Sequence, residues 1–166
     1  MKTRNCNFYV SKVWILIPVM IFLYSCGTSQ WTIPSEYVGN WKTGKHRITV
    51  RYKAEGDKHS KFISDSAIIT VKINSDKTAS GFIGQAEFDS GMLKKNAEHF
   101  LFWETGVAYI IECGPIGKIF DSDPLLTKDV EIWLGPLNES GEMRSSLRIG
   151  GSVFPMAGML FKKMDE

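Results

Sequence analysis

The stretch YVGNWKTGKHRITVRY, from Tyr37 to Tyr52, carries the first clear structural pattern of the chain. In its second half Ile48, Val50 and Tyr52 alternate with polar residues. Because successive side chains of a strand point to opposite faces, this alternation predicts a strand with one buried side and one wet side. Gly39 and Trp41, separated by one residue, stand just before that strand.

The same two-residue period recurs to the end of the chain, in segments 67–74, 80–88, 98–103, 107–113, 129–137, 143–151 and 153–163. In segment 80–88 we expect one buried face made of Phe82, Gly84, Ala86 and Phe88. Segment 91–99 could hold one helical turn, and no long helix is predicted. Many short strands at even spacing predict an all-β fold, either a sandwich or a barrel.

The N-terminal segment differs in composition from the rest. Val13 to Tyr24 is an uncharged, mostly apolar run preceded by Lys2, Arg4 and Lys12. A helix needs about 20 apolar residues to cross a bilayer, so this run is too short to span one. A basic start followed by a short apolar run predicts a secretory signal peptide over 1–25, with a buried core helix as the alternative.

The end of that segment, LYSC from Leu23 to Cys26, resembles a bacterial lipobox. The resemblance implies cleavage before Cys26 and attachment of lipid, palmitate included, to its sulfur. Two or more acyl chains anchor a protein stably, so we expect the mature chain to stay on a membrane. We expect the outer membrane where the cell has one, facing either the periplasm or the medium, with residues 26–36 as a tether.

The remaining cysteines and charges exclude several classes of protein. Once Cys6 is cleaved off and Cys26 carries lipid, only Cys113 is left, so no intramolecular disulfide can form, and we expect Cys113 to be a small buried hydrophobe. Cleavage also leaves 17 Lys and Arg against 18 Asp and Glu. That balance gives no reason to expect nucleic-acid binding, which needs clustered basic residues.

Gly39 and Trp41, the strand count and the basic final strand together resemble a lipocalin-like (calycin) domain over about residues 36–163. Small lipid-anchored proteins of Bacteroidetes type are similar. The resemblance implies an antiparallel up-and-down barrel of eight to ten strands over 37–166. It also implies that Trp41 closes one end beneath a basic side chain, supplied by Lys162 or Lys163, of which we assign Lys162. The alternative is that Trp41 is a core aromatic of another β fold.

A barrel of about eight strands has room inside for side chains or for one small ligand. The candidate lining residues are Val50, Tyr52, Val71, Phe82, Phe102, Tyr109 and Ile132. We therefore expect a membrane-anchored protein that binds a small apolar or amphipathic ligand. The same residues are what a packed core contains, so the alternative is a filled barrel that acts as a structural or protein-binding envelope component, with its protein partner unidentified.

No catalytic pattern accompanies these candidates. His46, His59 and His99 are scattered, and none has a second histidine at ligand spacing. The DSD run at 121–123 lacks the distal glutamate of a calcium loop and is expected to be a solvated loop. We expect no enzymatic activity, no metal and no cofactor.

Overall fold

The computed structural model describes residues 31–52, 56, 58–96, 108–124, 127–150 and 156–165, and its main compact unit spans Ile33–Glu166. Ile33 is buried, and a short 3-10 helix, η1, follows it at Ser35–Tyr37. The compact unit thus begins within the segment expected to be a tether. The predicted signal peptide, Cys26, Phe102 and the strand predicted at 98–103 lie outside the described residues.

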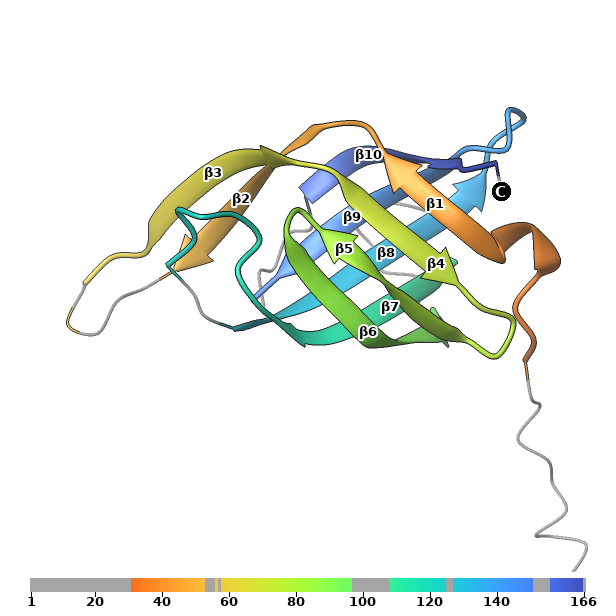
Figure 1. Ribbon diagram of the computed structural model, residues 1–166, viewed down its shortest axis with the longest axis horizontal. Helices are drawn as coiled ribbons and strands as arrows, with labels where there is room; N and C mark the ends of the chain where they lie inside the picture. Colours follow the sequence, from red (N-terminus) through yellow and green to blue (C-terminus); the bar gives the residue numbers. More distant parts are fainter. Residues whose placement is uncertain are drawn as a thin grey trace, which may run out of the picture. The chain divides into compact units, whose positions relative to one another are not determined.

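Eight antiparallel strands form a closed barrel, as the sequence pattern and the resemblance predicted (Figure 1). Around the barrel the order is β1, β10, β9, β8, β7, β6, β5, β4, and β4 pairs with β1 to close it. Their bounds are β1 Gly39–Thr43, β4 Ile69–Ile73, β5 Thr78–Ile83, β6 Ala86–Lys95, β7 Tyr109–Ile116, β8 Lys128–Leu137, β9 Met143–Ile149 and β10 Met156–Lys163. Closure removes the open edges that would otherwise invite pairing with other chains.

The two other strands, β2 (His46–Tyr52) and β3 (Lys61–Ala67), form a separate antiparallel ribbon. The chain passes from β1 into β2 and returns from β3 into β4, so the ribbon lies at one end of the barrel, opposite η1 (Figure 1). At this junction the Ile69 amide donates to the Thr43 hydroxyl, 3.0 Å away. That bond satisfies a buried amide where the ladder between β1 and β4 stops.

Alternating burial along the strands places an apolar core inside the barrel. The largest side chains with under 2 % exposure on barrel strands are Trp41, Ile69, Ile73, Ile83, Ile111, Ile116, Ile132, Leu134, Met143 and Phe161. Burying a large aliphatic or aromatic side chain contributes about 1.5–3 kcal/mol, so this set is the main stabilising element of the fold.

Two details of the sequence-based strand assignment were wrong. Segment 80–88 is a hairpin, because the chain turns at Gly84 and Gln85 between β5 and β6. The turn resets the alternation, so Phe82 lies on the outer surface with 45 % exposure, while Ala86 and Phe88 are buried. Residues 91–95, where the sequence left room for one helical turn, continue strand β6.

Candidate functional site

Trp41 closes the barrel end next to η1. Its ring is 1 % exposed, and its indole Nε1 donates to the Tyr37 carbonyl oxygen at 2.8 Å. Trp41 lies opposite Lys163 in the β1–β10 register, and the Lys163 ammonium stands 5.6 Å from the ring centroid. A cation at that distance over an indole is attracted by the negative face of the ring.

The basic partner of Trp41 is thus Lys163, and the assignment to Lys162 is corrected. Side chains of neighbouring strand residues point to opposite faces, so only one of the two lysines can reach the ring. The Lys162 ammonium instead lies 2.9 Å from a Glu142 carboxylate oxygen, in a pair whose lysine is exposed.

The geometry of Gly39 explains the glycine of the Gly-x-Trp pattern. Gly39 has a φ of +133°, which side chains rarely adopt, and a Cβ placed there would lie 2.9 Å from Cε of Lys163. Because Gly39 has no side chain, the aliphatic part of Lys163 can pass over it and bring the ammonium to Trp41. Gly39, Trp41 and Lys163 therefore form one packing unit.

A pair of tyrosines packs at the same end. Tyr37 and Tyr109 meet edge to face, with ring centroids 4.8 Å apart and an interplanar angle of 73°. The Tyr37 hydroxyl donates to the Gly135 carbonyl oxygen at 3.3 Å. Burial raises the pKa of Tyr37, and neighbouring Tyr109 and Glu36 raise it further. Tyr109, which was expected to line a ligand pocket, packs at this closed end of the barrel.

The other candidate lining residues do not gather in one place. Val71 lies opposite Trp41 in register, and Ile132 lies between Ile111 and Leu147. Val50 and Tyr52 belong to the β2–β3 ribbon, where Val50 is fully buried and Tyr52 is half-buried. Phe82 points outward, which corrects its assignment to the pocket, and Phe102 lies outside the described residues.

The opposite end of the barrel is packed by the segment between β7 and β8. Ile119 and Phe120 in this segment are buried, and the Gln85 amide donates to the Ile119 carbonyl oxygen at 3.1 Å. At Gly84, which has a φ of +62°, a Cβ would lie 2.3 Å from that same oxygen. The tight β5–β6 turn is therefore what lets the segment lie close to the barrel.

A buried ion pair holds this segment in place. Asp123 and Lys128 are 0 % and 1 % exposed, with Oδ2 and Nζ 2.7 Å apart. Nζ also donates to the Gly117 carbonyl oxygen at 2.8 Å, and Oδ2 accepts from the Ile119 amide at 3.1 Å. Of the DSD run expected to be solvated, Asp121 and Ser122 are exposed but Asp123 is a structural group. No pattern in the sequence distinguishes the buried Asp123 from the exposed Asp121.

Cys113 is buried as expected, and burial raises its pKa to about 12, with Glu131 contributing in the same direction. Among the described residues no group of three His, Cys, Asp or Glu side chains is placed to hold a metal ion. The described part of the chain also contains no helix long and apolar enough to span a membrane.

Comparison with known proteins gives no match to a family model, a curated protein or a solved structure. Functional inference therefore rests on the barrel, its two packed ends and its outer surface.

Proposed function

We propose that this protein is a lipid-anchored component of a bacterial cell envelope, with a filled lipocalin-like barrel that acts through its outer surface. The observation that carries this proposal is the packing of the barrel interior. Ile69, Ile111 and Ile132, on three different strands, have no exposed area. A side chain with no exposed area touches no void that could hold a water molecule, so a ligand at these positions would have to displace packed groups.

The packing at both ends supports the same function. Trp41, Tyr37 and Tyr109 fill the end next to η1, and the segment with Ile119 and Phe120 packs at the end next to the ribbon. A binding protein of the lipocalin type needs one accessible mouth leading to an apolar interior. Here these five aromatic and aliphatic side chains are buried, which favours surface contact as the mode of action.

The membrane anchor in this proposal comes from the lipobox-like LYSC ending at Cys26. Lipid on Cys26 would hold the domain close to a bilayer through the short segment that precedes Ile33. The chain enters the barrel through η1, at the end opposite the ribbon, so the ribbon is remote from the point where the anchoring segment joins the domain (Figure 1). The surface near the ribbon is then the part most available to partners.

A second function, binding of a small apolar molecule, is favoured by the composition of the interior. Apart from Thr43, Asp123, Lys128 and Ser145, the buried side chains in the described part of the chain are hydrophobic. A ligand admitted by movement of the β7–β8 segment would meet an apolar interior.

Native mass spectrometry of the mature protein, extracted from membranes in mild detergent, tests the proposal. We expect the 141-residue chain that begins at Cys26, with acyl chains attached to it and no other bound molecule. An unacylated Cys26 would contradict the anchor. A stoichiometric apolar molecule that is released on denaturation would contradict the filled barrel and support the second function.

A further inference from the structure

The β2–β3 ribbon carries an exposed basic and aromatic surface. Phe62 is 65 % exposed, the highest value among the large hydrophobic residues in the described part of the chain. It lies opposite Arg51 in register, and Arg47 shares the same face four residues earlier. We call Arg47, Arg51 and Phe62 the ribbon face. Within the described residues neither arginine forms an ion pair.

Charge is distributed unequally between the ribbon and the rest of the chain. Residues 45–67 contain six Lys and Arg and three Asp and Glu, a formal charge of +3. The rest of the chain from Cys26 onward contains eleven against fifteen, a formal charge of −4. Such an asymmetry steers the ribbon toward acidic surfaces, and the remainder of this same chain carries a net negative charge.

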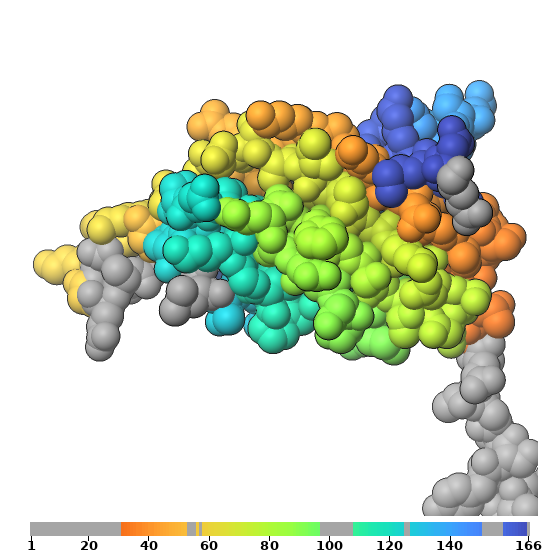
Figure 2. Space-filling model, in the orientation of Figure 1, coloured from red at the N-terminus to blue at the C-terminus, as the bar shows by residue number. Residues whose placement is uncertain are grey.

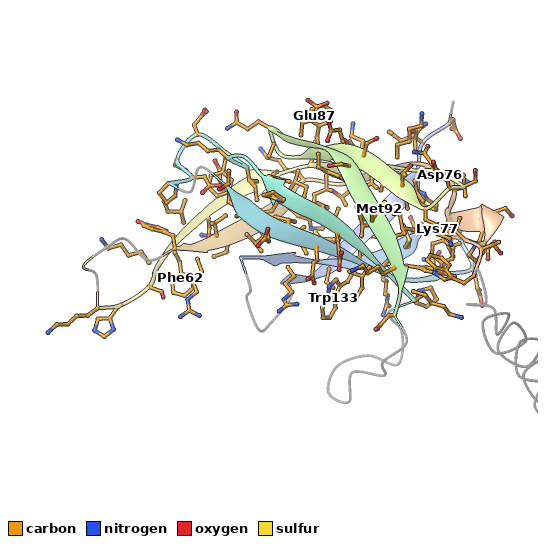
Figure 3. All side chains as sticks on the ribbon, turned by 90° about the horizontal axis from the view of Figure 1, so that it is seen from below. Phe62, Asp76, Lys77, Glu87, Met92 and Trp133 are labelled. Carbon is orange, nitrogen blue, oxygen red and sulfur yellow. The ribbon has the colours of Figure 1, made fainter. Side chains whose placement is uncertain are left out.

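A matching surface lies on the outside of β5 and β6. Phe82 and Met92 are 45 % and 47 % exposed, and Phe82 lies opposite the exposed Glu87 in register. Asp89 is exposed two residues further along β6, and we call these four residues the β5–β6 patch. Figure 3 shows Phe62 on the ribbon and Glu87 and Met92 on the barrel. Within the described residues neither acidic side chain forms an ion pair.

We propose that the ribbon face of one copy of this chain binds the β5–β6 patch of a second copy. Arg47 and Arg51 would pair with Glu87 and Asp89, and Phe62 would pack on Phe82. Aromatic residues and arginines are enriched among the few residues that contribute most of the binding energy at protein interfaces. Lys72 lies opposite Ser80, at the border of the patch. Its positive charge repels the basic ribbon, so binding is directed to the part of the patch near Phe82.

This contact is head to tail, since it joins two different surfaces. A bound pair still offers one free ribbon and one free patch, so the association can propagate along a row of copies. The contact is small and should be weak in dilute solution, whereas anchoring on a membrane raises the effective concentration. This contact rests on the surface mode of action proposed above, but its test does not depend on whether the barrel is filled.

Charge reversal on each surface separately, followed by mixing, tests the contact. The first variant carries Arg47→Glu and Arg51→Glu, and the second carries Glu87→Lys and Asp89→Lys. Each variant alone should associate about tenfold or more weakly than the wild type, because like charges then face each other in every pair. An equimolar mixture should recover association, since each variant offers the surface that the other one lacks.

The measurement is sedimentation velocity of the detergent-extracted full chain over a range of concentration and salt, with melting temperatures to establish that both variants fold. Association of the wild type should weaken as salt rises, because exposed charges are screened. A wild type that remains monomeric throughout would overturn the proposal, and so would a mixture that associates no better than either variant.

Disulfide trapping on membranes provides the second measurement. Phe62→Cys and Glu87→Cys copies produced together should form a cross-linked dimer, and the buried Cys113 should not interfere. Arg144→Cys, an exposed position on β9, is the matched control in place of Glu87→Cys. Equal cross-linking at the control position, or cross-linking of Phe62→Cys only to a different protein, would overturn the proposal. A bound ligand in the barrel would contradict the proposed function but would leave this result unaffected.

Discussion

Asp123 and Lys128 form an ion pair 2.7 Å apart in which both side chains are withdrawn from water. The same two groups bind the backbone of the β7–β8 segment, through the Ile119 amide and the Gly117 carbonyl. Burial of two charges is costly unless their remaining hydrogen-bonding capacity is used, and here part of it is used to fix the segment. The pair therefore determines whether the end of the barrel next to the ribbon stays packed.

Replacing Asp123 by Ala should destabilise the protein by about 3–5 kcal/mol, because Lys128 is left buried without a partner. The double variant Asp123→Leu with Lys128→Met removes both charges and should be clearly more stable than the single variant. Chemical unfolding of the full chain, followed by tryptophan fluorescence, measures both differences. A loss below about 1 kcal/mol for Asp123→Ala would show that water reaches Lys128 and that this end is open.

The contact between Lys163 and Trp41 should appear as a coupling energy. In a double-mutant cycle with Lys163→Met and Trp41→Phe, we expect a coupling of about 0.5–1 kcal/mol, as for cation–π pairs at exposed sites. The same cycle with Lys162→Met is the matched control, because Lys162 is paired with Glu142. Equal coupling for the two lysines would contradict the geometry described above.

The fold was predictable from the sequence because its main signals are local. Two-residue alternation predicts strands, and the resemblance of Gly39 and Trp41 to the lipocalin pattern predicts the end at which the barrel closes. The choice between Lys162 and Lys163 was not predictable, because a shift of one residue reverses every side chain of a strand. Phe82 was misplaced for the same reason, since the turn at Gly84 and Gln85 resets the alternation.

The surface features were harder to predict from the sequence than the fold was. Asp123 and Lys128 are joined by tertiary packing, and neither has a neighbour in sequence that marks it as buried. The overall charge from Cys26 onward is close to neutral, so the charge balance alone does not reveal the +3 of residues 45–67, and only the topology shows that β2 and β3 within this segment leave the barrel as a ribbon. The sequence therefore indicated a lipocalin-like barrel, with a ligand in the interior or a filled barrel as the two alternatives, but it did not indicate the ribbon face.

Alkaline pH should destabilise the protein through Cys113 and the two buried tyrosines. Burial raises the pKa of Cys113 from 9.0 to about 12 and raises the pKa values of Tyr37 and Tyr109 above 10.0. The folded state then binds protons more tightly than the unfolded state, so the free energy of unfolding is unaffected below pH 9 and falls as pH rises toward 12. Denaturant titrations across this range measure the slope.

The variant Cys113→Ala should reduce that slope in the lower part of the range, because the tyrosines begin to contribute only above pH 10. The thiolate is the reactive form of cysteine, so native Cys113 should react with an alkylating reagent far more slowly than the unfolded chain does. Rapid alkylation of the native protein near neutral pH would contradict the burial of this thiol.

Enlarging a side chain inside the barrel distinguishes a filled interior from a ligand cavity. Ile132 has no exposed area and lies between Ile111 and Leu147 in the sheet register, so Ile132→Phe should overpack the interior and destabilise the protein by about 1–3 kcal/mol. Ile110→Phe, on the half-buried outer face of β7, is the matched control and should change stability by about 0.5 kcal/mol or less.

The two outcomes of this substitution lead to different functions. In a packed core the phenyl ring has no space, because native interiors contain few voids larger than a water molecule. In a ligand cavity the ring would occupy the space of the ligand, so stability would be unchanged or higher and binding of an apolar fluorescent probe would be lost. Thermal unfolding of Ile132→Phe and of its control, with and without that probe, therefore decides whether the barrel interior is a packed core or a ligand-binding cavity.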